Sequence, residues 1–234
     1  MTEYFNFFGF PTVVQDLIAA EIVHNSIPED RIQFALTCKA FNELVKHAQP
    51  KKILPSIIIG RCKRDGTISY FYSTCPQVLY RVYDDTTATT MEEWLRNAQI
   101  QFLTLSATIF SDEFKDHVEF LNVFHEATKF VTTLRILVSR RSSLNPGYLN
   151  FYEKLKHLKC LEFEGPFEDF VKLSKIPSNL NLRFLYYDAD FTVLAEKLAA
   201  VQLSDLYFNQ HYNKEEFQQL LKKTKFTDDA KIYF

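Results

Sequence analysis

The sequence predicts an α/β protein in which three N-terminal helices precede a β-hairpin and a short curved arc of alternating parallel strands and helices. Three observations lead to this fold class. Near the N-terminus, apolar residues recur at spacings of three and four, as on one face of a helix. Two β-rich runs then flank Asp65-Gly66. From about residue 92 onward, one strand pattern returns several times, with helix-like segments between its copies.

The N-terminal helices are placed by apolar spacing and by two prolines. The first is expected over residues 12–25 and is marked by Val14, Leu17, Ile18 and Ile22. Pro28 is expected to begin a second helix, because proline suits the first helical position. A third helix is expected over residues 39–47, and Pro50 ends it. A segment as short as residues 10–45 cannot bury all of its own apolar side chains. We therefore expect another surface to cover them.

A hairpin is expected next, because Asp65-Gly66 is a preferred two-residue turn between strands. The recurring strand pattern after it is apolar-x-x-apolar-x-apolar. Its five copies are Ile100/Leu103/Leu105, Val131/Leu134/Ile136, Leu158/Leu161/Phe163, Leu182/Leu185/Tyr187 and Leu203/Leu206/Phe208. A truncated copy closes the chain at Ile232 and Phe234.

The spacing of the copies is that of a repeat protein. Their first positions are 31, 27, 24 and 21 residues apart. Leucine-rich repeats run at roughly 20–29 residues, so all intervals but the first fit. Strands joined through helices at this period are parallel, which predicts a short leucine-rich-repeat-like α/β solenoid arc with strands inside and helices outside. The asparagine position of such repeats is mostly missing, and the alternative is an unrelated α/β domain.

Composition restricts the function classes. The formal net charge of −2 argues against a general nucleic-acid or membrane-surface binder. The four cysteines form no CxxC pair and suit a reducing compartment. The first ten residues do not resemble a signal peptide, and no apolar run approaches the roughly 20 residues of a membrane helix. A cytoplasmic or nuclear protein is therefore expected.

Motifs of catalysis are missing from the sequence. The six histidines form no HExxH or other zinc spacing. The chain has five glycines and no glycine-rich phosphate loop, and no GxSxG elbow occurs. We therefore expect no enzyme activity, no catalytic residue, no cofactor and no metal.

The N-terminal segment resembles an F-box. The apolar-proline pair that opens the family is here Phe10-Pro11, followed by the helix that carries Val14 and Leu17. The acidic-basic-apolar step is here Glu29-Asp30-Arg31-Ile32. The motif then closes with Leu36, Cys38-Lys39, Phe41, Asn42 and Leu44. The match covers about 38 of the 234 residues, and the wider layout resembles the nematode-expanded F-box proteins.

The resemblance implies that residues 10–50 bind a Skp-family adaptor, which links them to a cullin-RING (SCF-type) ubiquitin ligase. Such a partner would cover the apolar helices, which then need no core of their own. The residues expected to contact the adaptor or to shape its site are Phe10, Pro11, Val14, Leu17, Ile18, Ile22, Pro28, Ile32, Leu36, Cys38 and Phe41. The alternative is that these helices only cap the repeat domain, since solenoid ends need caps.

Residues 51–234 are expected to bind the target protein. Side chains between the apolar positions of each strand would face the concave surface of the arc. The candidates are Phe102, Arg135, Glu162, Glu164, Phe184, Tyr186, Asp188, Asp205, Tyr207, Asn209, Lys231 and Tyr233. Exposed aromatic residues beside acids are typical of protein-binding surfaces. Acids outnumber bases in this set, so a partner with a basic or mixed surface is expected. Packing of Phe184 or Tyr186 under a terminal segment remains an alternative.

These expectations combine into an F-box substrate receptor that holds one protein near a ubiquitin ligase and so promotes its ubiquitination and degradation. A non-degradative protein that pairs with the adaptor and sequesters a partner is one rival. A plain repeat protein with a helical cap is the other.

Overall fold

The computed structural model describes residues 6–64, 67–73, 88–110, 118–140, 142–185, 189–208 and 214–233, with side chains except those of 60–64, 67–73, 88, 89, 108 and 118. This part of the chain forms nine α-helices, two short 3-10 helices and eight strands. The strands are β1 (Lys52–Arg64), β2 (Thr67–Ser73), β3 (Ala98–Ser106), β4 (Thr133–Leu137), β5 (Cys160–Gly165), β6 (Asn179–Phe184), β7 (Gln202–Phe208) and β8 (Lys225–Tyr233).

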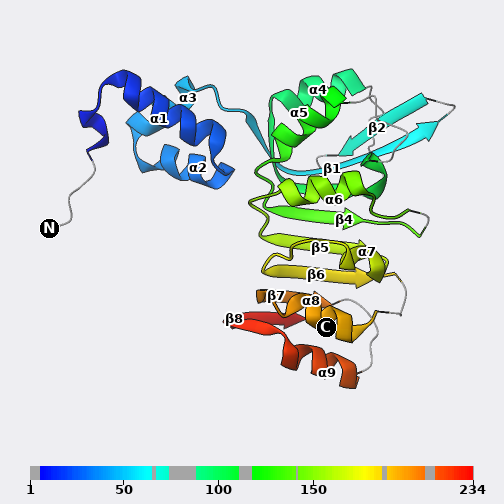
Figure 1. The fold of residues 1–234 in the computed structure, drawn as a ribbon. Helices are drawn as coiled ribbons and strands as arrows, with labels where there is room; N and C mark the ends of the chain where they lie inside the picture. The colour runs from blue at the N-terminus through cyan, green and yellow to red at the C-terminus, as the bar shows by residue number, and fades with distance from the viewer. Residues whose placement is uncertain are drawn as a thin grey trace.

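The eight strands form one sheet in the order β2-β1-β3-β4-β5-β6-β7-β8 (Figure 1). β1 and β3–β8 are parallel to one another, and β2 pairs antiparallel with β1. The expected α/β class with parallel strands is therefore confirmed. The hairpin is not a separate unit, because its first strand also pairs with β3 and so belongs to the sheet.

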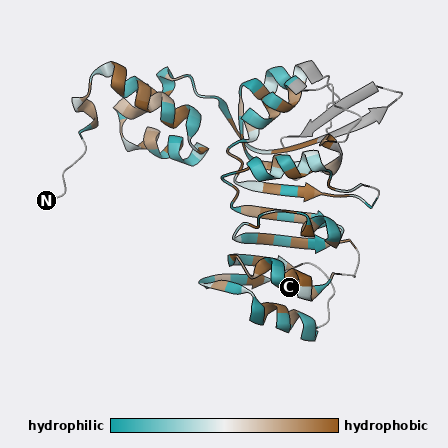
Figure 2. Cartoon of the chain, in the orientation of Figure 1, coloured by the Kyte–Doolittle hydropathy of each residue, from teal (hydrophilic) through white to brown (hydrophobic). Residues whose placement is uncertain are grey.

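Helices connect the parallel strands and cover one face of the sheet (Figure 1). They are α4 (Ala88–Arg96), η2 (Ala107–Phe110), α5 (Val118–Thr128), α6 (Pro146–Lys154), α7 (Phe167–Val171), α8 (Phe191–Leu198) and α9 (Lys214–Lys223). Buried side chains of these helices and of the strands form one continuous core. Hydrophobic and hydrophilic residues alternate along the central strands, which buries one face of each (Figure 2).

The N-terminal helical module consists of η1 (Phe7–Gly9), α1 (Thr12–Asn25), α2 (Pro28–Thr37) and α3 (Lys39–His47). α1 and α3 have the bounds expected from the sequence, and α2 begins at Pro28 as expected. Pro28 occupies the first turn of α2, and Cys38 is extended and separates α2 from α3. The buried Ala19, Val23 and Val45 do not belong to the core of the sheet. The module therefore has a small core of its own.

The register of β6 differs from the repeat pattern expected for it. Leu180 pairs with Leu161, and Leu182 pairs with Phe163. The pattern had placed Leu185 opposite Leu161, and this prediction is wrong by five residues. Because side chains alternate between faces, an odd shift exchanges the core face and the open face of the strand. Elsewhere the copies predict the pairing correctly: Leu103 pairs with Leu134, Leu134 with Leu161, and Leu206 with Ile232.

Candidate protein-binding surfaces

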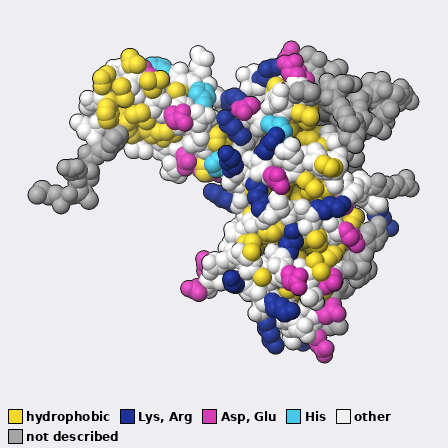
Figure 3. Space-filling model, viewed as in Figure 1, with side chains coloured by type: hydrophobic (Ala, Val, Ile, Leu, Met, Phe, Trp, Pro, Cys, Tyr) yellow, Lys and Arg dark blue, Asp and Glu magenta, His cyan; other side chains and the backbone are white. Residues whose placement is uncertain are grey.

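Large apolar side chains are exposed on the helical module. Val13 is 69% exposed, Leu17 is 65% exposed and Leu36 is 72% exposed. In the described part of the chain, the other large apolar side chains with comparable exposure are Phe8, Phe10, Ile32, Tyr207 and Tyr233, and the first three also belong to the module. Figure 3 shows hydrophobic side chains gathered over one side of the module. A contiguous apolar surface of this kind marks an interaction site.

The composition of α1 explains why it cannot hide its apolar residues. Ala19 and Val23 face inward and are almost completely buried, whereas Val13 and Leu17 point to solvent. The helix is thus apolar on both its inner and its outer side. Helices that are apolar on all sides are normally buried on all sides. We therefore expect the exposed outer side of α1 to bind another surface.

Aromatic stacking holds the module in shape from the inside. Phe7 is buried and lies edge-on to Phe41, with the ring centroids 4.8 Å apart. Phe34 stacks on Phe41 at 4.4 Å. His24 Nε2 also lies 2.8 Å from the carbonyl oxygen of Ala48, which joins the end of α1 to the end of α3. The helices that carry the exposed apolar residues are therefore held together by packing inside the module.

A groove of about 430 Å³ runs between α1 and α3. Its lining includes two polar side chains and is otherwise apolar, and it consists of Val13, Asp16, Leu17, Ala20, Leu44, His47 and Ala48. The groove could receive apolar side chains of a partner.

The expected adaptor-binding residues differ in their accessibility. Those exposed to solvent are Phe10, Pro11, Leu17, Ile32, Leu36 and Cys38. Those half-buried are Val14, Ile18, Ile22 and Phe41. Pro28 is buried at the start of α2, so of the two expected roles it fits that of shaping the site and not that of touching the adaptor. Phe8 and Val13 are exposed but were not in the predicted set, although Val13 follows the helical spacing of Leu17.

A second candidate surface is the face of the sheet that α4–α9 leave open. The strand pairing places its side chains in rows that run across the strands. One row is Phe102, Thr133, Cys160, Asn179, Asp205 and Lys231. The next row is Thr104, Arg135, Glu162, Asn181, Tyr207 and Tyr233.

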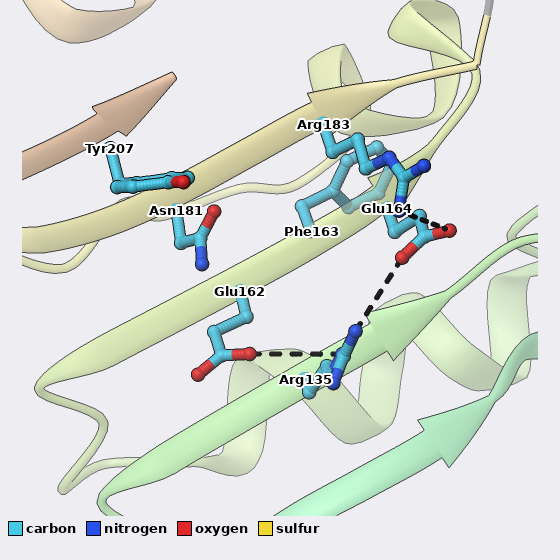
Figure 4. Close-up of a pocket in the computed structure, with 7 residues that line it drawn as sticks. All are labelled: Arg135, Glu162, Phe163, Glu164, Asn181, Arg183 and Tyr207. Carbon is cyan, nitrogen blue, oxygen red and sulfur yellow. Dashed lines mark ion pairs between the residues drawn. The ribbon is translucent and has the colours of Figure 1, made fainter. Parts of the chain in front are cut away.

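Charged side chains of both signs alternate at the centre of this open face (Figure 4). Arg135 Nε lies 3.7 Å from Glu162, and another nitrogen of the same guanidinium lies 3.5 Å from Glu164. Glu164 also lies 3.6 Å from Arg183. These side chains line a hollow of about 240 Å³ together with Phe163, Asn181 and Tyr207. All three separations exceed hydrogen-bond length, so the charged groups keep hydrogen-bonding capacity for a partner.

Most of the described candidates for target binding do lie on the open face. Phe184 does not: it is 4% exposed and packs among Phe163, Phe167, Phe170 and Phe208. Its inclusion is wrong because the register shift of β6 turned it toward the core. Three further candidates, Tyr186, Asp188 and Asn209, lie outside the described residues. The same shift brings Asn181 and Arg183 to the open face, where the sequence pattern did not place them.

The arrangement offers little to reactive chemistry. Burial, followed by the charges of Glu162 and Asp205, raises the pKa of Cys160 to about 11, so this thiol is neutral at physiological pH and is a poor nucleophile. Within the described ranges, no three His, Cys, Asp or Glu side chains gather as metal ligands would. Likewise, none of the helices in these ranges is both long and apolar enough to cross a bilayer.

Comparison with known proteins gives no relative from which a role could be transferred. The chain matches no family model, no curated protein and no solved structure. The two surfaces described above therefore carry the functional assignment.

Proposed function

We propose that the chain is an F-box substrate receptor of a cullin-RING ubiquitin ligase that acts in the cytoplasm or nucleus. In this proposal the helical module binds a Skp-family adaptor. The sheet and its helices form a leucine-rich-repeat-like arc, whose open face binds one target protein. The observation that carries the proposal is the exposed apolar surface of the module around Val13, Leu17 and Leu36.

The contact between the module and the sheet argues against a simple cap. A cap would bury its apolar side against the repeat domain. Here hydrogen bonds join the two parts: Gln99 Nε2 donates to the carbonyl oxygen of Ser26 at 3.1 Å, and Gln101 Nε2 donates to Glu29 at 3.1 Å. The apolar side meanwhile remains in solvent. The module stands beside the sheet rather than over its open face (Figure 1), which leaves both surfaces accessible.

The open face supplies what a target-binding surface requires. Tyr207 and Tyr233 are exposed, and their ring centroids lie 6.0 Å apart. Tyrosine is enriched at binding hot spots because it adds contact area with little loss of side-chain entropy. Cations and carboxylates alternate beside the two rings, which suits a partner surface of mixed charge. The receptor would act by proximity, since a bound target lies near the ligase at high effective concentration.

Adaptor capture is the direct test. We predict that the chain co-purifies with a coexpressed Skp-family adaptor and cullin, and that Leu17→Asp with Leu36→Asp abolishes this capture. Both side chains are exposed, so the charges should leave folding intact while they disrupt an apolar interface, where anchors typically contribute about 2 kcal/mol or more each. Tyr207→Ala is the matched control, because it removes an exposed apolar side chain elsewhere and should capture the adaptor normally. A wild-type chain that ignores the adaptor would refute the proposal.

The fate of the target separates degradation from sequestration. Proteins bound by the wild-type chain but not by Tyr207→Ala should have longer half-lives when the proteasome is inhibited. An unchanged half-life, together with intact adaptor capture, would favour the sequestering rival.

A further inference from the structure

Three side chains from neighbouring strands form one corner of the hollow on the open face. Glu162 on β5, Asn181 on β6 and Tyr207 on β7 lie in the same row across the sheet. Figure 4 shows Asn181 between the other two, with the Tyr207 ring lying over this side of the hollow. Tyr207 is 42% exposed, and Glu162 and Asn181 are half-buried. A side chain entering the hollow could therefore reach all three.

The corner is the electronegative side of the hollow. The guanidinium groups of Arg135 and Arg183 lie 3.5 and 3.6 Å from Glu164, so two cations offset the negative charge of this carboxylate. Glu162 has one cationic neighbour, Arg135, at the longer distance of 3.7 Å. Asp205, one row away, adds a second carboxylate to this side. The negative field of Glu162 and Asp205 is also felt at Cys160, where it adds to the rise in pKa.

Hydrogen-bonding groups in the corner are available to a ligand. In the described part of the chain, neither the Asn181 amide nor the Tyr207 hydroxyl has a hydrogen-bond partner, and the Glu162 oxygens are beyond hydrogen-bond length from Arg135. Glu162 and the Asn181 oxygen can accept hydrogen bonds, and the Tyr207 ring presents a π face. Acceptors grouped around an aromatic face suit a flat cation that carries several N–H donors.

We propose that this corner binds the side chain of an arginine on the surface of the recognised protein. The guanidinium donates two hydrogen bonds to the Glu162 carboxylate and one to the Asn181 oxygen, while its plane lies on the ring of Tyr207. The inference rests on the proposed function, because it names the chemistry by which the open face selects its target.

Other side chains fit this corner less well. A carboxylate in this corner would lie beside Glu162 and near Asp205, whereas Arg135 and Arg183 lie on the side of the hollow where Glu164 already offsets their charge. A lysine carries the charge but lacks the planar fork that matches a carboxylate and an aromatic ring together. The hollow, at about 240 Å³, has room for one long side chain.

The experiment uses the full chain and a small probe, N-acetyl-arginine amide, titrated while the side-chain amide signal of Asn181 is followed by NMR. We expect saturable shifts of this signal. The citrulline analogue, which has the same shape without the charge, should bind about tenfold more weakly, because a charged hydrogen bond is lost. Glu162→Gln should weaken the arginine probe by a similar factor, and Tyr207→Leu by about threefold, through loss of the cation–π contact.

Glu168→Gln is the matched control, since Glu168 is an exposed carboxylate on α7 and should leave the affinity unchanged. Equal affinity for the arginine and citrulline probes would overturn the inference, as would shifts that leave the Asn181 signal untouched. Adaptor capture is measured separately. A chain that binds the arginine probe but not the adaptor would refute the proposed function alone, and the reverse result would refute this inference alone.

Discussion

At the scale of single residues, the buried carboxylate of Asp169 joins α7 to the segment that precedes α6. Its carboxylate is almost fully buried at the start of α7. One oxygen accepts hydrogen bonds from the Ser143 hydroxyl at 2.6 Å and from the Leu144 backbone N–H at 3.1 Å. Lys172 Nζ lies 2.6 Å from the same oxygen and neutralises it. The segment before α6 is thereby fixed to α7.

We predict that Asp169→Ala lowers the free energy of unfolding by about 2–4 kcal/mol, because it leaves a buried N–H and a hydroxyl without their acceptor and Lys172 without its anion. Urea unfolding followed by circular dichroism would measure the loss. Asp169→Asn keeps an acceptor oxygen of the same shape and should cost less than the alanine variant. If both variants unfolded like the wild type, the carboxylate would have no part in joining the two segments.

At the scale of elements, two lysines satisfy the ends of the short helices on the covered face. Lys175 Nζ donates to the carbonyl oxygens of Glu153 and Leu155, at the end of α6. Lys197, in α8, donates to those of Val171 and Leu173, at the end of α7, at 2.7 and 2.6 Å. A cation at a helix C-terminus satisfies free carbonyls and interacts favourably with the helix dipole. Each of the two lysines comes later in the sequence than the helix that it caps, beyond the next strand or helix. Its hydrogen bonds therefore join one strand–helix unit to the next.

We predict that Lys197→Met destabilises the fold by about 1–2 kcal/mol, since two carbonyl oxygens lose their donor while the aliphatic part of the side chain is kept. Lys156→Met is the control, because Lys156 is exposed and its charge should matter little. Chemical denaturation of the two variants side by side would test this. Equal stability of both variants would show that the Lys197 bonds contribute nothing.

The pH dependence of the Lys197 contribution has a defined sign. Burial lowers the pKa of Lys197 in the folded chain below its ordinary value of 10.5. In the window just below pH 10.5, the unfolded chain therefore binds more protons at this site, so folding becomes more favourable as the pH rises. We predict that the stability difference between the wild type and Lys197→Met widens as the pH approaches 10.5. Denaturation of both chains at pH 8 and at pH 10 would measure it, and a difference that narrowed would contradict the lowered pKa.

The sequence predicts most elements but not every face of the sheet. The bounds of α1 and α3 and the start of α2 are as expected because local signals, such as Pro28 at a helix start, decide them. The repeat pattern predicts the wrong register for β6 because Pro177 occupies the first apolar position of the copy that contains Leu180 and Leu182, so the pattern matches only further along the chain, at Leu182/Leu185/Tyr187. The alternation of Asn179 to Phe184 was the better signal, since it matches a strand with one buried face. The hollow around Glu162 depends on that register and so could not be predicted without it.

At the scale of the whole molecule, polar contacts and a strained turn set the position of the helical module relative to the sheet. Beyond the bonds of Gln99 and Gln101, Lys129 Nζ lies 3.5 Å from the side-chain oxygen of Asn25. Gln49, between α3 and β1, has a φ of 49°, which a residue with a side chain rarely adopts. Together these features give the module a preferred orientation, which would fix the distance between a bound adaptor and a bound target.

We predict that Gln99→Ala with Gln101→Ala frees the module without unfolding either part, because the two bonds join the parts and do not support either core. Small-angle scattering should show a larger maximum dimension, and limited proteolysis should cut faster between α3 and β1. Gln218→Ala with Gln219→Ala, on exposed positions of α9, is the matched control and should scatter like the wild type.

Adaptor capture and binding of the arginine probe should both survive in the Gln99→Ala, Gln101→Ala variant, since neither surface is touched. Ubiquitination of the target should nevertheless fall, because a loosely held module no longer presents the target at a fixed distance from the ligase. Unchanged scattering would show that the orientation does not depend on these two glutamines, and it would leave the Lys129–Asn25 contact and the turn at Gln49 as its supports.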